Sequence, residues 1–152
     1  MRKVIEFSSA TVEPLAKEHE IEVETHFPSH PIVISGEQDK LHQLFDNLLT
    51  NAIKYNRQGG KIMVDLSQTS DSVLVRVSDT GMGISHQSFK EVFTRHFQEK
   101  TKPLGNIKGL GIGLSLVQEI VKLHRGAIQL ESEVGEGTTF TVMLPLQTKE
   151  SN

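Results

Sequence analysis

The chain has 152 residues, of which 36% are hydrophobic and 23% are charged, values that suit one ordinary water-soluble domain with a sizeable core. Its 16 basic and 19 acidic residues give a net charge of -3, so the composition lacks the basic excess of a nucleic-acid-binding protein. The absence of cysteine excludes disulfides and thiolate metal sites, and no apolar run approaches the roughly 18 residues that span a bilayer.

The first quarter of the chain predicts a helix followed by two strands. Residues 8–19 carry apolar side chains at helical spacing, with a serine at the start as N-cap. Residues 20–27 alternate apolar and polar side chains, which predicts a strand with one wet face, and residues 32–34 predict a short second strand. Residues 35–37 are expected to cap the next helix.

A second helix, predicted over residues 37–55, carries an unusual polar stripe. Its leucines and Phe45 share one face, whereas Asn47, Asn51 and Lys54 follow one another along another face. Asparagine is a poor helix former because its side chain competes for backbone groups, so two of them four residues apart suggest another task. The stripe is either a solvated face or a row of amide and ammonium groups offered to a metal ion and phosphates.

The remainder of the chain alternates strands, glycine-rich turns and a third helix. In order we expect a hairpin of strands at residues 61–67 and 72–78, a glycine-rich loop at 79–84, a short helix at 85–92, a long polar connection at 93–108, a helix from about 109 to 124, two strands at 127–132 and 138–144, and a frayed tail at 147–152. Every strand has one apolar face and each long helix one apolar stripe. The expected fold is therefore α+β, a single domain over residues 1–152 with three long helices on one face of a mixed, mainly antiparallel sheet.

Glycines gather at the ends of these elements. Neither standard phosphate-binding glycine motif is present, since the sequence lacks GxxxxGK[ST] and has no GxGxxG between a strand and a helix. Three clusters nevertheless occur, Gly81 with Gly83, Gly109 with Gly111 and Gly113, and Gly135 with Gly137. Glycine is needed where the backbone bends unusually or comes close to a ligand, so the clusters and the polar stripe together indicate a binding site.

Five short motifs carry a family resemblance over roughly residues 5 to 146. In order they are Asn47-x3-Asn51-x2-Lys54-Tyr55, Asp79-x-Gly81-x-Gly83, Phe93-x-Arg95-x-Phe97, Gly109-x-Gly111-x-Gly113-Leu-Ser and Gly135-x-Gly137-Thr-Thr. In order and spacing this set resembles the N, G1, F, G2 and G3 boxes of bacterial sensor histidine kinases. The resemblance implies the Bergerat ATP-binding fold, a two-layer α/β sandwich with a flexible ATP lid at about residues 93–110.

The resemblance assigns one group of residues to the adenine. Asp79 would accept a hydrogen bond from the adenine amino group, and Tyr55 would lie against the ring. Thr138 or Thr139 would reach the base edge directly or through water; Thr139 is the residue that we include in the predicted site. The backbone beside the base would come from Gly81, Gly83 and Ile84.

A second group is assigned to the phosphates and their magnesium ion. Asn47 and Asn51 would supply oxygens toward Mg²⁺, and Lys54 would offset phosphate charge, with Asn47 and Lys54 as the catalytic residues. The backbone amides at the start of the third helix would bind the phosphates, aided by the helix dipole. They belong to Gly109, Leu110, Gly111, Ile112, Gly113 and Leu114.

The resemblance also implies partners outside this chain. No histidine stands in the context of the family's phosphoacceptor helix, so the dimerisation and phosphoacceptor domain and the sensor domain are expected to lie elsewhere in a longer protein. The domain alone would be monomeric and cytoplasmic, without nucleic acid as a partner. The full protein would be a homodimer, free or membrane-anchored, that acts on a response regulator.

Three functions remain open. The first is transfer of the γ-phosphoryl group of ATP to a histidine on the acceptor domain. The second is ATP hydrolysis, for which gyrase-type and chaperone relatives place a glutamate where this chain has Asn47, and an amide cannot act as the general base. The third is a regulatory nucleotide-binding module without transfer activity, suggested by His96 and Phe97 in the F box, where the family usually has Phe and Tyr.

Overall fold

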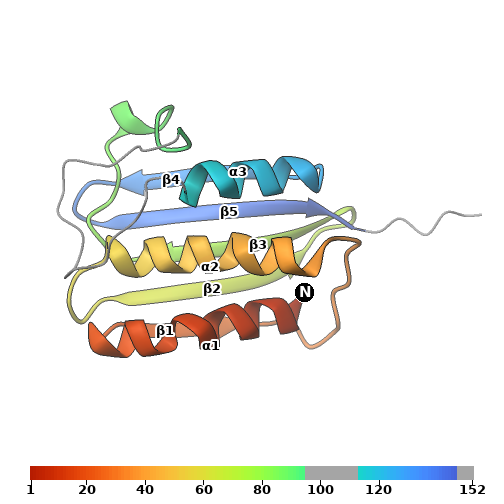
Figure 1. Ribbon diagram of the computed structural model, residues 1–152, viewed down its shortest axis with the longest axis horizontal. Helices are drawn as coiled ribbons and strands as arrows, with labels where there is room; N and C mark the ends of the chain where they lie inside the picture. Colours follow the sequence, from red (N-terminus) through yellow and green to blue (C-terminus); the bar gives the residue numbers. More distant parts are fainter. Residues whose placement is uncertain (95–112, 147–152) are drawn as a thin grey trace, which may run out of the picture.

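The structure, a computed structural model, describes residues 1–94 and 113–146. Its elements are α1 (Arg2–Glu18), β1 (Glu22–His26), α2 (Gln38–Lys54), β2 (Lys61–Gln68), β3 (Ser72–Asp79), the 3-10 turn η1 (His86–Ser88), α3 (Gly113–Leu123), β4 (Ala127–Glu133) and β5 (Gly137–Pro145). The strands form one sheet in the order β1-β2-β3-β5-β4, in which only the β1–β2 pair is parallel. All three α-helices of the described residues cover one face of this sheet (Figure 1). The expected α+β sandwich is confirmed.

The core lies between the helices and one face of the sheet. On β5, residues alternate between half-buried and buried, so that Phe140, Val142 and Leu144 point toward the helices. On α2 the predicted apolar face is buried, including Leu44 and Phe45. This packing fixes the orientation of α2 and therefore determines which of its faces is left for the polar stripe.

Two predictions near the N-terminus are wrong. The first helix begins at Arg2, six residues before the predicted start, and Met1 rather than a serine occupies the N-cap. The burial of Val4 and Ile5 against the core extends the helix, and the Met1 ammonium donates to the Ile32 carbonyl at 2.9 Å. The predicted strand at residues 32–34 does not form, although Ile32 is buried. Its backbone anchors the N-terminus and joins no sheet.

The region after β3 also differs from expectation. In place of a helix over residues 85–92, only the 3-10 turn η1 forms, followed by turns to residue 94. Ser85 and Ser88 exchange a hydrogen bond between their hydroxyls at 2.9 Å, a local contact that competes with helix formation. The predicted lid, apart from residues 93 and 94, and the start of the third helix before Gly113 lie outside the described residues.

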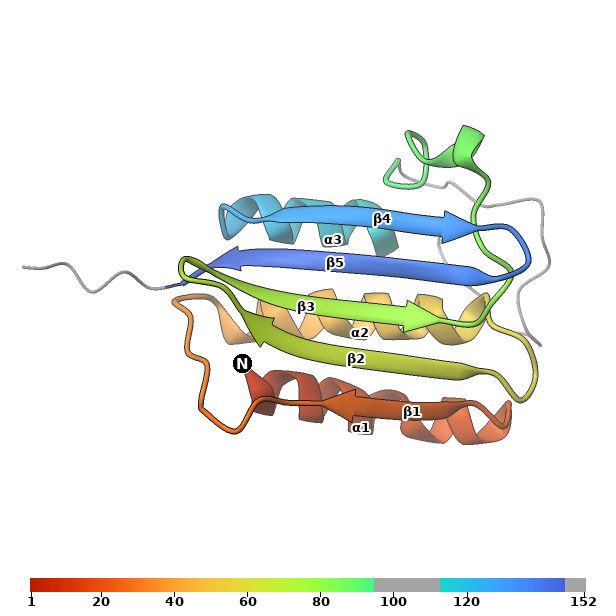
Figure 2. The ribbon, with the colours of Figure 1, turned by 180° about the vertical axis from the view of Figure 1, so that it is seen from behind.

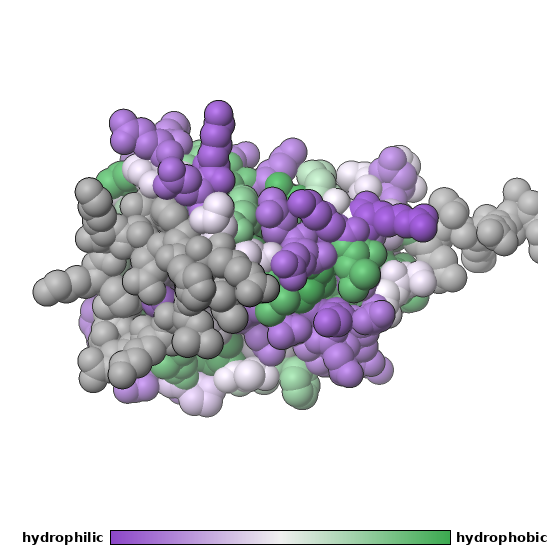
Figure 3. All heavy atoms as spheres, turned by 45° about the horizontal axis from the view of Figure 1, so that its top comes forward, coloured by the Kyte–Doolittle hydropathy of each residue, from purple (hydrophilic) through white to green (hydrophobic). Residues whose placement is uncertain are grey.

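The surface of the helical layer is mostly hydrophilic. In Figure 3, hydrophilic side chains surround a smaller hydrophobic area of the described surface. Four large apolar side chains of the described residues are exposed, namely Phe7, Val33, Leu123 and Val134. Within residues 1–94 and 113–146, no helix combines the length and apolar content required to cross a bilayer.

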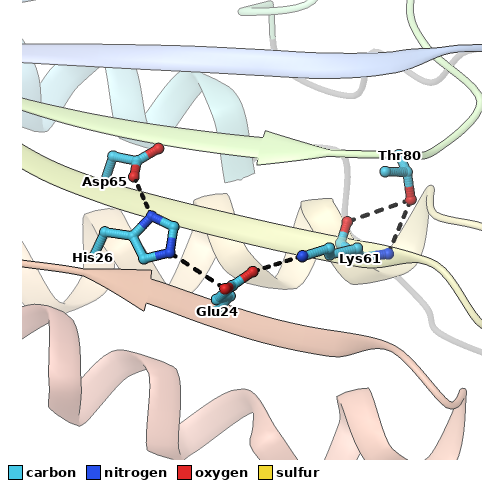
Figure 4. A network of polar contacts seen from close by, with 5 residues as sticks. All are labelled: Glu24, His26, Lys61, Asp65 and Thr80. Carbon is cyan, nitrogen blue, oxygen red and sulfur yellow. Dashed lines mark hydrogen bonds and ion pairs between the residues drawn. The ribbon is translucent and has the colours of Figure 1, made fainter.

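The other face of the sheet is not covered by helices (Figure 2). At its β1 edge, His26 Nδ1 lies 2.7 Å from Asp65 and His26 Nε2 lies 3.4 Å from Glu24. The second oxygen of Glu24 pairs with the Lys61 ammonium at 2.6 Å (Figure 4). We call these four residues the open-face network. Acidic and basic groups alternate along it, so that Lys61 pairs with Glu24 and a protonated His26 pairs with both Glu24 and Asp65.

Candidate functional site

Three turns meet at one end of the sheet, where β3 ends and β5 begins. The Met82 amide donates to the Tyr55 carbonyl at 3.0 Å, and the Gly135 amide donates to the Met82 carbonyl at 2.8 Å. The loop after β3 is therefore held between the end of α2 and the β4–β5 turn. These backbone contacts bring together the predicted N, G1 and G3 boxes, which are distant in sequence.

The glycines of this region allow very close backbone packing. A Cβ on Gly83 would lie 2.1 Å from the Glu133 carbonyl oxygen, and a Cβ on Gly137 would lie 2.0 Å from that of Asp79. Both glycines also have positive φ, +74° and +138°. No side chain fits at either position, which explains why glycine stands there.

The carboxyl group of Asp79 is the central polar group of this end. Its Oδ1 accepts backbone hydrogen bonds from Gly81 at 2.8 Å and from Thr138 at 3.3 Å. Within the described part of the chain, Oδ2 has no hydrogen-bond partner. Burial raises the pKa of Asp79 from 3.8 to about 6, although the two backbone hydrogen bonds act in the opposite direction. One oxygen is thus fixed in place, while the other remains available to a ligand.

Thr138 faces the same side of the sheet as Asp79. The two residues are direct partners in the β3–β5 ladder, and Thr138 is 7% exposed. Thr139 points to the opposite, open face, where its hydroxyl donates to Ser78 at 3.0 Å. The structure therefore brings Thr138 to Asp79 and does not bring Thr139 there. The alternation of Phe140, Val142 and Leu144 was the sequence signal that could have separated the two threonines.

Other polar residues of this region were missed from the sequence. Asn56 is 1% exposed, and its Oδ1 accepts from the Arg57 amide at 2.8 Å and from the Thr80 hydroxyl at 3.2 Å. The Arg57 guanidinium donates to the carbonyls of Thr80 at 2.6 Å and Gly135 at 3.2 Å. These contacts tie the three turns together around the residue that follows Asp79. They depend on pairings across long sequence distances, for which the sequence has no local signal.

A cavity of about 240 Å³ opens on the β4–β5 hairpin. Asp79, Ser132 and Thr138 contribute to its lining, together with Glu131, Glu133, Glu136, Gly137 and Thr139. Because Glu131, Glu133 and Thr139 alternate with the inward-facing residues of their strands, this cavity reaches the open side of the sheet. Its acidic rim is unsuited to phosphates, so a phosphate chain would have to lie toward α2.

The polar stripe of α2 runs beside the first residue of α3. A Cβ added to Gly113 would lie 3.7 Å from Asn47 Oδ1 and 3.9 Å from Asn51 Nδ2. Both asparagines are half-buried, and neither side chain has a hydrogen-bond partner within the described residues. Amide groups that reach the surface without a partner among the described residues are accessible to a ligand.

Lys54 and Tyr55 end the stripe. Lys54 is buried and has no ion-pair partner among the described residues, and its ammonium lies 5.0 Å from the centre of the Tyr55 ring. That distance allows a cation–π interaction. An ammonium group without an anionic partner among the described residues is suited to an anionic ligand at this position.

The remaining predicted residues have mixed outcomes. The Ile84 amide donates to the Ser132 hydroxyl at 2.7 Å, so this amide is not available to a ligand. Leu114 is half-buried and packs against the core. Gly109, Leu110, Gly111 and Ile112 lie outside the described residues.

The two asparagines fit a magnesium ion by their chemistry. Amide oxygens are ligands for hard cations, and Mg²⁺ takes few protein ligands because it keeps several waters. Within residues 1–94 and 113–146, no group of three or more histidine, aspartate or glutamate residues could hold a metal ion. Among the described residues of this end, Asn47 and Asn51 are the side chains whose chemistry suits a metal held together with phosphates.

Comparison with known proteins identifies the family. The model of the histidine kinase-, DNA gyrase B- and HSP90-like ATPases matches residues 36–148. The chain belongs to this family. The matched range includes α2, the Asp79 loop and the β4–β5 turn, and family membership makes ATP the expected ligand class.

Individual relatives agree with this assignment. The sensor histidine kinase WalK of Bacillus subtilis is 29% identical over 99% of this chain and 25% of its own length. The circadian input-output histidine kinase CikA of Synechococcus elongatus is 38% identical over 76% of this chain and 15% of its own length. The solved structure of the mycobacterial sensor histidine kinase MprB matches with a TM-score of 0.84 and 29% identity, over 95% of both chains. The resemblance to sensor histidine kinases is confirmed.

The chain is shorter than its curated relatives. It spans between 12% and 28% of the length of those compared here. The structure of full-length ShkA in complex with AMPPNP contains the same fold; the match covers 98% of this chain and 30% of that chain, with a TM-score of 0.84 and 24% identity.

Proposed function

We propose that this domain binds Mg-ATP and transfers the γ-phosphoryl group to a histidine on a separate dimerisation and phosphoacceptor domain. The carboxyl group of Asp79 is the observation that carries the proposal, since this half-buried group is desolvated enough to raise its pKa, has no cationic partner among the described residues and keeps one oxygen free. Such an arrangement costs stability, which is expected of a ligand site and not of a structural contact.

The adenine would bind at the Asp79 end. The free Oδ2 would accept a hydrogen bond from the 6-amino group, while the bonds from Gly81 and Thr138 hold Oδ1 still. Tyr55, at the end of α2, would lie against the ring. For this contact the Lys54 ammonium would leave the Tyr55 ring and turn toward the phosphates.

The phosphates would lie along the polar stripe of α2. Asn47 and Asn51 would hold the magnesium ion, which when bound neutralises charge on the phosphate oxygens. Lys54 would add a positive charge beside them. The N-terminal end of α3, whose first described residue Gly113 lies next to both asparagines, would direct its amides to the phosphates.

The chemical step would require only positioning and charge stabilisation from this chain. The bond between the γ-phosphorus and its bridging oxygen breaks, and a bond to the attacking imidazole nitrogen forms. ADP leaves with the electron pair of the broken bond. Since the imidazole comes from another domain, the contribution of Asn47 and Lys54 is to hold the triphosphate in line with it.

The partners follow from this division of labour. The acceptor histidine would belong to the dimerisation domain of the full-length protein, which would be a homodimer. A response regulator would then receive the phosphoryl group. The relatives named sensor histidine kinases support this assignment, because they match this chain over only part of their length.

Two other functions make different predictions. ATP hydrolysis would require a general base near the γ-phosphate, and Asn47 cannot serve as one. A regulatory module would bind ATP without transferring its phosphoryl group. His96 stands where the family usually has Phe. This difference favours the regulatory module, since the F box is the motif that would meet the acceptor domain.

The test is a transfer assay with two separate components. This domain is mixed with the acceptor domain of the full-length protein and γ-labelled ATP, and label on a histidine is expected. ATP binding without label would favour the regulatory module, and rapid phosphate release by the domain alone would favour hydrolysis. Asp79→Asn should abolish the label, whereas Asp65→Asn, the same change on the open face, should not.

A further inference from the structure

Ser132 lies on β4 and faces the helical side of the sheet, next to the Asp79 region. It is buried, with 8% of its surface exposed, and its hydroxyl oxygen makes three polar contacts. The Ile84 amide lies 2.7 Å away, the Gly137 carbonyl 2.8 Å and the Thr138 hydroxyl 2.8 Å. Ser132 therefore connects the loop after β3 with both strands of the β4–β5 hairpin.

The direction of the hydrogen bond between the two hydroxyls follows from counting hydrogens. A serine hydroxyl has one hydrogen to donate and can accept two bonds. The Gly137 carbonyl can only accept, so the Ser132 hydrogen goes to it, and the Ile84 amide can only donate. The Thr138 hydroxyl must therefore donate its hydrogen to Ser132.

This leaves Thr138 with only lone pairs for a ligand. Its hydroxyl hydrogen is used by Ser132, and its backbone amide already donates to Asp79 Oδ1. The Gly81 amide is also bound to Asp79 Oδ1. Asp79 Oδ2 and Thr138 Oγ1 thus form a pair of acceptors on directly opposed residues of β3 and β5.

We propose that Ser132 is a positioning residue for base specificity, which makes Thr138 a second acceptor for the 6-amino group of adenine. The inference rests on the proposed ATP site. A purine with a carbonyl at position 6 would place an acceptor against this pair, directly or through one bridging water. Without Ser132, the Thr138 hydroxyl can rotate and donate to that carbonyl.

The test compares ATP with ITP, which carries a 6-oxo group in place of the 6-amino group. Binding of each is measured by calorimetry for the unchanged protein, Ser132→Ala, Thr138→Val and the double variant. We expect Ser132→Ala to lower the ratio of ATP affinity to ITP affinity by about fivefold, the worth of one hydrogen bond, chiefly by improving ITP binding. In the Thr138→Val background, Ser132→Ala should leave the ratio unchanged.

A purely structural role for Ser132 gives a different result. If Ser132→Ala weakens ATP and ITP binding equally, or changes the ratio equally in both backgrounds, the inference is overturned. Should Ser132→Ala fail to fold, Thr138→Ser and Thr138→Val decide instead. The serine should keep the ratio because it retains the hydroxyl, and the valine should lower it; equal ratios would overturn the inference. Failure of the unchanged protein to bind ATP would reject the proposed function itself.

Discussion

The Asp79 region and the open-face network are two polar groups of one sheet that satisfy their charges in different ways. In the open-face network, acidic and basic groups alternate, and every charge has a partner within 3.4 Å when His26 is protonated. Asp79 is held by two backbone amides and has no charged partner among the described residues. The network residues are exposed or half-buried and Asp79 is half-buried, but desolvation is the dominant influence on the pKa of Asp79 alone.

The pKa shifts of the two groups have different causes. The carboxylates of Asp65 and Glu24 raise the pKa of His26, so its charged form is favoured by hydrogen bonds from the ring. Burial raises the pKa of Asp79 to about 6, so its charged form is disfavoured by loss of water. The first arrangement stabilises the fold, and the second destabilises it near neutral pH.

This difference distinguishes polar groups that contribute to the fold from polar groups that bind a ligand. Exposed ion pairs add little to stability and need no ligand. A desolvated carboxylate without a charged partner is more readily explained by ligand binding than by a contribution to stability. Substitutions at Asp79 should therefore weaken ligand binding and increase stability, whereas substitutions in the open-face network should change stability alone.

The largest effect is expected from Asp79→Asn. The substitution replaces a carboxylate, whose oxygens accept, by an amide whose NH2 group can only donate. ATP binding should become weaker by about 100-fold or more, as measured by calorimetry. The same variant should be more stable near neutral pH. The folded pKa is raised, so the stabilising contribution of Asp79 is full below pH 3.8 and is lost as the pH rises through about 6. The gain on substitution is at most about 3 kcal/mol.

Urea unfolding at two pH values tests that stability change. The variant should exceed the unchanged protein above pH 6 and match it near pH 4. Asp65→Asn is the control, since it makes the same chemical change in the open-face network and should leave ATP affinity intact. Equal loss of ATP affinity in both variants would remove the distinction between the two regions.

The second effect concerns how the Asp79 region is held in place. Gly137→Ala would put a Cβ 2.0 Å from the Asp79 carbonyl oxygen at a φ of +138°. We expect a loss of about 3 kcal/mol or more in the free energy of unfolding, since clash and backbone strain add. Gly135→Ala, at a φ of +86° with nothing within 4 Å, should cost only about 1 kcal/mol. Similar losses for both would show that backbone approach does not hold this region.

The third effect is a pH dependence of base binding. Because only ionised Asp79 presents two acceptors, affinity should fall by up to roughly tenfold per pH unit below about pH 6. Adenosine is the ligand of choice, because it has no phosphate groups that titrate in this range. Affinity that is constant from pH 5 to 8 would mean that the charge of Asp79 does not matter to base binding.

Much of this fold was predictable because periodicity is local. The apolar face of α2 and the alternation of β2, β3 and β5 follow from the burial of every third or fourth and every second residue. The start of α1 was not predictable in this way, because it depends on the burial of Val4 and Ile5 against residues that are distant in the sequence. Residues 32–34 have the sequence pattern of a strand, but they join no sheet, and the Ile32 carbonyl accepts a hydrogen bond from the Met1 ammonium.

The candidate site likewise contains residues that the sequence predicts and residues that it does not predict. Asp79, the stripe of α2 and the glycines could be found from motifs, because each motif is short and continuous. Ser132, Thr80 and Arg57 act through contacts with residues far away in the chain, as in the bond from Arg57 to the Gly135 carbonyl. Their roles depend on the register of the sheet and on three turns meeting at its end, which no local pattern encodes.

The smallest effect is expected from His26→Gln, and it tests the comparison from the structural side. Since Asp65 and Glu24 raise the folded pKa of His26, its contribution to stability is full below pH 6.5 and is lost as the pH rises through the folded pKa. Thermal unfolding should therefore show a larger decrease at pH 5 than at pH 8, while ATP affinity stays unchanged. Lys61 joins the network to the Asp79 region, because its backbone amide donates to the Thr80 hydroxyl at 2.9 Å. A loss of ATP affinity in His26→Gln would mean that this contact couples the two regions, and the open-face network would then belong to the site.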